Sequence, residues 1–270
     1  MRTYVFLFFI LLLAAVLRLI WLDSIPPAIM GDELIYILTA KAIVLTGTDV
    51  TGTWHPFSLL FFQYPPQQMQ AELPYLLALP AAMGMFSLAG TKLLYAAISV
   101  ATVWILYLIG KTLGNKQVGL IAACVAAINP WFIMIGRTSY EVIPATFFYL
   151  CAFYVLIKAK GRNILWSLPL LFLAFYSYIG TKLLFIPFVI LTCSYAYYML
   201  HKKKFLKEYI TVCIASFLLV AFFLLAVKLN PAGSRMGELF TPFSSEITKQ
   251  VIQSRHTTIH SPFTTVFENK

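Results

Sequence analysis

The sequence predicts an all-α, polytopic membrane protein with about seven transmembrane helices. Hydrophobic residues make up 60% of the chain and charged residues 11%, and the mean hydropathy is +0.83. A soluble domain of this length needs a more polar surface. Several apolar runs are long enough to cross a bilayer, and Lys and Arg gather in the short linkers between them. These observations together predict the fold class.

The apolar runs define the candidate spans. An α-helix rises ~1.5 Å per residue, so a bilayer core of ~30 Å needs about 20 residues. The first run follows Arg2 like a signal peptide, but it is long and no small-residue cleavage site follows it, so we expect a retained helix. The runs lie at about 4–22, 73–89, 93–110, 117–135, 142–157, 164–180, 183–200 and 209–227.

Three basic linkers determine the expected topology. They are 111–116, 158–162 and 201–207, and two apolar runs separate each linker from the next. All three should therefore lie on one side, which the positive-inside rule assigns to the cytoplasm. Arg2 belongs on the same side only if 73–89 does not cross the membrane. We therefore predict seven spans, a cytoplasmic N-terminus and a multi-pass protein of the plasma (inner) membrane.

The excluded run should be a juxtamembrane helix on the outer face. It contains Pro74 and Pro80 and is at the short limit for a span. A long first outer loop, 23–91, would then hold two interfacial helices, at about 33–46 and 73–89. The spans and this loop form one predicted module, 1–228. The polar segment 229–270 is predicted to be an outer-face tail that leads into a further C-terminal part.

Charge and cysteine usage exclude several function classes. The net charge of +10 comes largely from the linkers, and no basic stripe alternates with aromatics, so we expect no nucleic-acid partner. The four cysteines all lie in apolar runs without a CxxC spacing and indicate neither a metal site nor disulfides. No charged residue lies near the middle of a span, which disfavours an ion-coupled transporter.

Charged residues instead gather at the outer ends of the spans. Asp32 and Glu33 are the sharpest candidates, because paired carboxylates opposed by separate cations suit a reaction between a hydroxyl and a lipid phosphate. The acids could equally cap the helix that follows them. The outer-end set is Arg18, Asp23, Asp32, Glu33, Lys92, Arg137, Glu141, Lys182, Lys228 and Arg235.

Three members of this set allow two interpretations each, one structural and one ligand-binding. Arg137 and Glu141 lie four residues apart and could form an ordinary helical ion pair, or they could hold a phosphate and a divalent cation. Lys182 could extend to the membrane interface or bind the same phosphate. The residues alone leave both readings open.

The order of these motifs resembles the GT-C superfamily, especially glycosyltransferase family 39 enzymes of the protein-mannosyltransferase and aminoarabinose-transferase type. The resemblance covers nearly the whole chain. Lys92 and Lys182 stand where Arg is more usual in the family, and Glu141 stands where Asp is found. The similar segments are Pro27–Tyr36 with its acidic pair, Tyr64–Pro66, Leu73–Leu76, Phe86–Gly90, Asn129–Arg137 followed by Glu141, and Tyr176–Tyr178 with Lys182 and Pro187.

The resemblance implies transfer of a sugar from a polyprenyl-phosphate donor to an acceptor hydroxyl at the outer face, with inversion. Asp32 would be the general base, and Glu33 would orient the acceptor or share a metal. Arg137, Lys182 and Arg235 would stabilise the phosphate. Glu141, with Asp32, would hold a divalent ion such as Mg or Mn.

Two other classes stay open at this stage. A lipid or solute transporter or flippase should show polar residues or broken helices at the membrane midplane. A non-catalytic membrane scaffold would use the outer charges as interfacial anchors only. The sugar and the acceptor class, whether protein, lipid or glycan, cannot be read from the sequence.

Overall fold

The computed structural model describes residues 2–26, 31–48, 72–85, 87–200 and 202–229. These residues form helices and no strand, which confirms the all-α prediction for this part of the chain. The elements are α1 (Arg2–Leu19), α2 (Gly31–Thr46), α3 (Glu72–Ala82), α4 (Leu88–Leu113), α5 (Lys116–Ile128), α6 (Pro130–Ile135), α7 (Val142–Lys158), η1 (Gly161–Trp166), α8 (Ser167–Ser177), η2 (Ile179–Thr181), α9 (Lys182–Tyr198), η3 (Lys203–Phe205) and α10 (Leu206–Leu229).

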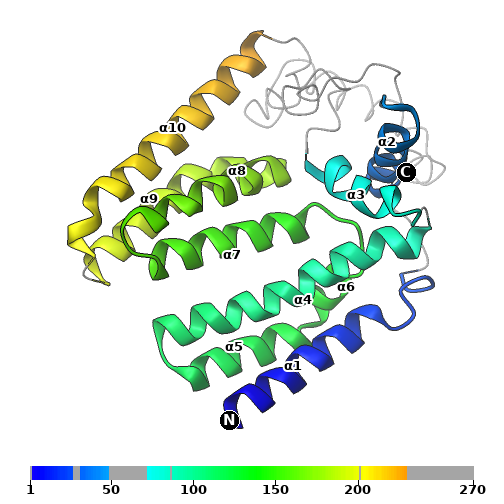
Figure 1. Cartoon of the computed structure of the whole chain (residues 1–270), viewed down its shortest axis with the longest axis horizontal. Coiled ribbons are helices and arrows are strands. Elements are labelled where there is room, and N and C mark those ends of the chain that lie inside the picture. Colours follow the sequence, from blue (N-terminus) through cyan, green and yellow to red (C-terminus); the bar gives the residue numbers. More distant parts are fainter. Residues whose placement is uncertain (1, 27–30, 49–71, 86, 201, 230–270) are drawn as a thin grey trace, which may run out of the picture.

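The long helices form an elongated bundle, with α2 and α3 gathered at one end of it (Figure 1). Helix α4 packs on α5 and α7, α7 packs on α8, and α1 packs on α4 and α5. The N-terminus and the connections α4–α5, α7–α8 and α9–α10 lie at the opposite end (Figure 1). The basic linkers occupy those connections, so they share one end of the molecule.

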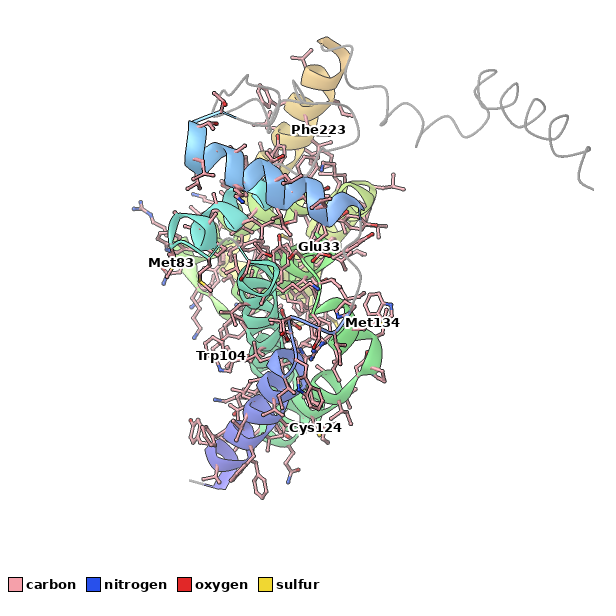
Figure 2. The ribbon with its side chains drawn as sticks, turned by 90° about the vertical axis from the view of Figure 1, so that its right-hand side faces the viewer. Glu33, Met83, Trp104, Cys124, Met134 and Phe223 are labelled. Atoms are coloured by element: carbon pink, nitrogen blue, oxygen red, sulfur yellow. The ribbon has the colours of Figure 1, made fainter. Side chains whose placement is uncertain are left out.

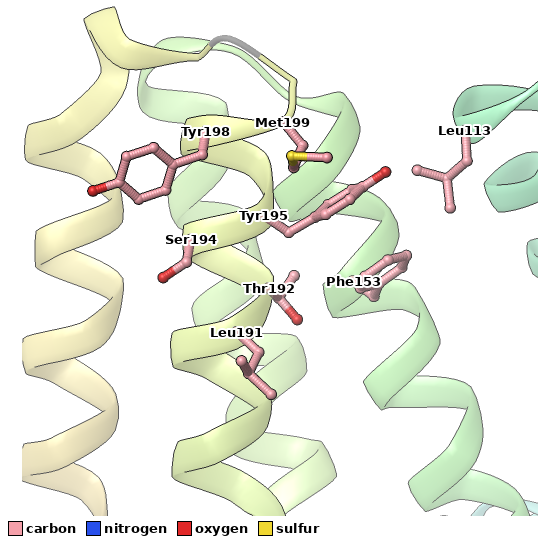
Figure 3. Close-up of a pocket in the computed structure, with 8 residues that line it drawn as sticks. All are labelled: Leu113, Phe153, Leu191, Thr192, Ser194, Tyr195, Tyr198 and Met199. Atoms are coloured by element: carbon pink, nitrogen blue, oxygen red, sulfur yellow. The ribbon is translucent and has the colours of Figure 1, made fainter.

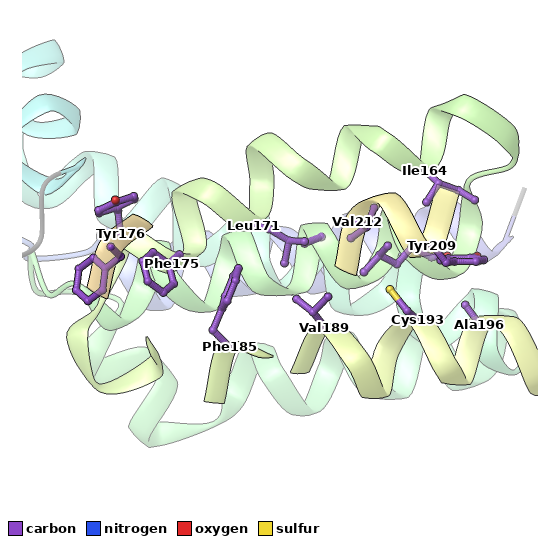
Figure 4. Close-up of a cluster of buried hydrophobic side chains, with 13 residues drawn as sticks. Ile164, Leu171, Phe175, Tyr176, Phe185, Val189, Cys193, Ala196, Tyr209 and Val212 are labelled. Carbon is purple, nitrogen blue, oxygen red and sulfur yellow. The ribbon is translucent and has the colours of Figure 1, made fainter. Parts of the chain in front are cut away.

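Buried apolar side chains hold the C-terminal helices together. One cluster joins α7, η1, α8, α9 and α10 through side chains that include Leu171, Phe175, Val189 and Val212 (Figure 4). A second cluster places Tyr36 of α2 and Leu77 of α3 against Tyr95 of α4 and Ile143 of α7. The second cluster fixes the start of α2 near the start of α7, where candidate site residues lie.

Helices α4 and α5 approach each other closely at two glycines. A Cβ on Gly110 would lie 2.9 Å from the Cα of Gly119, and a Cβ on Gly119 would lie 2.6 Å from the carbonyl oxygen of Tyr107. Small residues permit this approach, and they are common where helices pack closely in a membrane. The turn between them is closed by Asn115, whose side chain accepts hydrogen bonds from the amides of Gln117 and Val118.

Two predicted boundaries were wrong. The run 117–135 was predicted as one span but is two helices, because Asn129 accepts a hydrogen bond from Phe132 N at 2.9 Å and starts α6 at Pro130. Helix α5 alone is about 20 Å long, less than a bilayer core. The helix predicted at 73–89 ends at Ala82, before Gly84 with a φ of +78°.

Two described helical segments, Ala89–Leu113 and Lys203–Leu225, are long and apolar enough to cross a membrane. Five further apolar helices have only 10–17 residues, so length and composition support membrane association and no particular number of spans. Large apolar side chains also face outward, among them Phe8, Ile121 and Leu218, each about 60% exposed or more. Met83 and Met134 lie at the periphery, whereas Glu33 lies inside (Figure 2).

Candidate functional site

Glu33 joins two segments that sequence analysis selected separately. Its side chain, in the first turn of α2, is 1% exposed, and its Oε1 accepts a hydrogen bond from the backbone N–H of Ser139 at 2.8 Å. Ser139 lies in the connection between α6 and α7, between Arg137 and Glu141. The structure therefore places the acidic pair of α2 beside the Arg137–Glu141 segment, although 106 residues separate Glu33 from Ser139.

The second carboxylate oxygen of Glu33, Oε2, is buried and has no hydrogen-bond partner among the described residues. A buried carboxylate oxygen without a partner is costly, so such groups are uncommon in folded proteins outside functional sites. The predicted catalytic residues are Asp32 and Glu33, and of these two only Glu33 has a described side chain. Its Oε2 is a buried acceptor that suits a ligand hydroxyl.

Two predicted site residues cannot be placed in the same way. Asp32 lies in the first turn of α2, but its side chain is outside the described part. Arg235 lies wholly outside the described residues, as does the tail predicted at 229–270 beyond Leu229.

Arg137 binds backbone carbonyls at the C-terminal end of α1. Its Nη1 donates to Leu17 O at 2.7 Å, its Nη2 donates to Trp21 O at 3.1 Å and to Ile20 O, and its Nε donates to Ile25 O at 3.2 Å. Leu17 lies in the last turn of α1, and the other three carbonyls lie in the turn after it, where Trp21 O also accepts from the amides of Ser24 and Ile25. A cation at this end complements the helix dipole. The guanidinium is 7% exposed, and desolvation lowers the pKa of Arg137 from its ordinary value.

The contacts of Arg137 differ from both sequence-based readings. The helical ion pair with Glu141 would direct the guanidinium along α7, and a phosphate site would leave N–H groups available for oxygen atoms of a ligand. The described hydrogen bonds of Arg137 go instead to α1 and the turn after it. In this conformation Arg137 can supply positive charge to a nearby ligand but few hydrogen bonds.

Arg18 also donates to carbonyls at the end of a helix, a role that sequence analysis did not assign to it. It is fully buried, donating from Nε to Ser99 Oγ at 2.8 Å and from its terminal nitrogens to Ala126 O and Ala127 O at 3.1 Å. The last two are the final carbonyls of α5, which Asn129 and the following proline leave without helical partners. An Asn-Pro break inside an apolar run is the signal that could have predicted a buried donor here.

Glu141 and Lys182 are both buried, at 6% and 7% exposure. Glu141 precedes α7, and its side chain forms no capping hydrogen bond with that helix. The described residues contain no group of three His, Cys, Asp or Glu able to hold a metal ion. The donor set proposed from the resemblance, Glu141 with Asp32, consists of carboxylates, which suit Mg or Mn.

Lys182 begins α9 and points inward instead of toward the interface. Its Nζ lies 5.2 Å from the ring centre of Phe175, 5.7 Å from that of Tyr176 and 5.4 Å from that of Phe223. The rings come from α8 and α10, so the ammonium group connects three helices through cation–π contacts. Lys92 of α4 is also buried, and its Nζ donates to Pro26 O at 3.3 Å.

No family model, curated protein or solved structure matches this chain. The site must therefore be judged on its own chemistry. It offers the buried carboxylate of Glu33 on α2, joined to the segment that holds the buried Arg137 and Glu141, whereas Lys182 lies against rings of α8 and α10. Such a site can orient a hydroxyl and stabilise an anion in a water-poor setting.

Proposed function

We propose that the chain is the membrane-embedded catalytic part of a GT-C type glycosyltransferase. It would transfer a sugar from a polyprenyl-phosphate donor to an acceptor hydroxyl at the outer membrane face. The observation that carries the proposal is the Glu33–Ser139 hydrogen bond, which brings the Asp32–Glu33 pair to the segment holding Arg137 and Glu141. A buried Glu33 oxygen without a described partner adds to it.

The proposed topology has seven spans with the N-terminus in the cytoplasm. Lys202 Nζ donates to Ala159 O at 2.6 Å, which ties the α9–α10 linker to the α7–η1 linker at one end of the bundle. The N-terminus and the α4–α5 linker lie at that end too (Figure 1). Since basic linkers favour the cytoplasm, Glu33 and the segment Arg137–Glu141 would face outward.

The proposed reaction needs one base and no acid. Asp32 removes the proton of the acceptor hydroxyl as its oxygen attacks the anomeric carbon, and the bond from that carbon to the phosphate oxygen breaks. The polyprenyl phosphate leaves with the electron pair, so in-line attack inverts the anomeric configuration. Unlike a glycosidase, the enzyme need not protonate its leaving group.

The other residues would bind and orient. Glu33 accepts a hydrogen bond from the acceptor through Oε2, while Ser139 N holds Oε1 in place. Arg137, Lys182 and Arg235 provide positive charge for the phosphate. A divalent ion such as Mg or Mn, if used, would be held by Asp32 and Glu141 and would supply further charge stabilisation of the phosphate.

Loss of the base should abolish transfer. Membranes containing wild type or Asp32→Asn are supplied with a panel of labelled polyprenyl-phosphate sugars, and the labelled product is measured. We expect transfer to fall by about 100-fold or more in Asp32→Asn, the range for removal of a general base. Asp23→Asn, which removes an exposed acid just after α1, is the matched control and should retain transfer.

The outcomes separate the competing classes. Equal transfer by wild type and Asp32→Asn would remove Asp32 as the base. No transfer by wild type from any donor would contradict the enzyme and favour a flippase or a scaffold. A lipid-flipping assay on the same membranes then distinguishes those two.

A further inference from the structure

A groove of about 690 Å³ lies at the basic end of the bundle, between the end of α4 and the ends of α7 and α9. Leu113 of α4 stands opposite Phe153 of α7 and Tyr195 of α9, and Met199 lies at the same level as Tyr195 (Figure 3). The volume falls in the ~300–1,000 Å³ range of small-molecule sites. The groove is mainly apolar, so its occupant must present a hydrocarbon surface.

Basic residues lie close in the chain to the residues that line this groove. Lys111 lies two residues before the lining residue Leu113, and Lys202 lies three residues after the lining residue Met199. Lys158 ends α7, and Lys160 follows it, next to the carbonyl that Lys202 binds. The apolar groove thus has lysines close in the chain to its lining residues, and these lysines are here called its rim.

Besides its burial, Lys202 has Lys158 and Lys160 close enough to lower its pKa. Partial burial, followed by the charges of Lys160 and Lys158, lowers the pKa of Lys202 to about 8. The three basic linkers, 111–116, 158–162 and 201–207, contain no acidic residue. An anionic group from outside the chain would relieve this repulsion.

We propose that this groove binds an anionic phospholipid, with an acyl chain between Leu113 and Tyr195 and the phosphate on Lys158, Lys160 and Lys202. Charge complementarity and the apolar lining select this occupant: inorganic phosphate has no group for the groove, and a zwitterionic lipid lacks the net charge. The inference rests on the membrane location in the proposed function and not on sugar transfer. The site lies at the far end of the bundle from Glu33, so it is separate from the proposed donor site.

The test is lipid binding by the whole chain, purified in mild detergent, measured by native mass spectrometry with added phosphatidylglycerol or phosphatidylcholine. We expect wild type to prefer phosphatidylglycerol. The triple variant Lys158→Gln/Lys160→Gln/Lys202→Gln should bind it about tenfold more weakly or worse, because each lysine near an anionic lipid contributes several-fold in affinity. Lys203→Gln/Lys204→Gln/Lys207→Gln removes the same charge at the same end and should stay within about twofold of wild type.

A second variant tests the groove itself. Leu113→Trp places an indole opposite Phe153 and Tyr195 and should reduce phosphatidylglycerol binding without removing a charge. Equal losses in the two triple variants, no effect of Leu113→Trp, or equal binding of both lipids would each overturn the proposal. Alkaline carbonate extraction of the membranes, done first, tests the membrane location separately, since a chain that is extracted would contradict the proposed topology itself.

Discussion

At the scale of single residues, the two arginines at helix ends show how buried charge is used in this fold. Arg18 and Arg137 donate to carbonyls at the C-terminal ends of α5 and α1. Both guanidinium groups are buried, and each provides hydrogen bonds to carbonyls at a helix end, where unpaired carbonyls are costly. The arginines therefore stabilise the same region that the Glu33–Ser139 bond organises.

Arg137 should stabilise the fold through its hydrogen bonds and not through its charge alone. Arg137→Lys keeps the charge but cannot contact carbonyls of Leu17, Trp21 and Ile25 together, because lysine lacks the planar fork. We expect a loss of about 2 kcal/mol, on the scale of unsatisfied buried groups, seen as a lower Tm of the purified protein. Arg162→Lys, at an exposed position of η1, should leave the Tm unchanged.

A different result would support the hypothesis that Arg137 binds the donor phosphate. If Arg137→Lys keeps the wild-type Tm and only raises KM for the donor, the carbonyl contacts do not stabilise the fold and Arg137 acts mainly on the donor phosphate.

At the scale of elements, breaks and linkers decide how the helices meet. The glycine contact between α4 and α5 allows the two backbones to approach, and the Asn129 cap ends α5 early. The η1 and η3 turns bring two basic linkers together through Lys202. Each feature sets a distance between helices that the apolar pattern alone leaves undetermined.

The α4–α5 contact should tolerate no side chain at Gly119. A Cβ there would lie 2.6 Å from Tyr107 O and 3.0 Å from Lys111 N, both backbone atoms that cannot move aside alone. Gly119→Leu should therefore destabilise the protein by about 1–3 kcal/mol, the usual effect of overpacking, even though leucine favours helix. Thermal unfolding in detergent measures it, with exposed Val118→Leu as the neighbouring control.

The linker contact predicts a pH dependence of stability. The pKa of Lys202 is lowered to about 8 in the folded chain, below its ordinary value of 10.5. Between these values the unfolded chain binds more protons than the folded chain, so the contribution of Lys202 to stability increases as pH rises from about 8 to about 10. The Tm of wild type minus that of Lys202→Gln, in lipid-free detergent, should rise across this window. A flat difference would show that Lys202 titrates normally.

At the scale of the whole molecule, the gathering of the basic linkers at one end is the main feature. One end carries the N-terminus and the basic linkers, and the other carries α2 and α3 (Figure 1). Glu33 lies in the first turn of α2. The outward side chains between the ends are largely apolar. This distribution suits a bundle whose ends face two different aqueous compartments.

The sidedness is testable with single cysteines in a chain whose four native cysteines are replaced. Leu45→Cys, in α2, and Lys203→Cys, in the α9–α10 linker, both lie at exposed positions. In intact cells an impermeant thiol reagent should label position 45 and not position 203, and it should label both after permeabilisation. Equal labelling of both positions in intact cells would contradict the proposed topology.

The sequence by itself determined the helices and their ends where local chemistry decides them. The apolar runs at 93–110 and 142–157 predicted α4 and α7 to within a few residues. It also selected Glu33, Arg137, Glu141 and Lys182, which the structure shows to be buried. Apolar length and the cost of charge in a membrane are local properties, so they can be read residue by residue.

Only the tertiary structure decided what these residues contact. The partners of Arg137 and Arg18 are mostly backbone carbonyls more than 100 residues away, and the partner of Glu33 is the amide of Ser139. Every residue except proline carries both groups, so the sequence does not mark which of them is chosen. The packing of α1 against α5 and α6 made that choice for the two arginines, and the packing of α2 against α4 and α7 made it for Glu33, because each brought these backbone groups within hydrogen-bond distance of the buried charges.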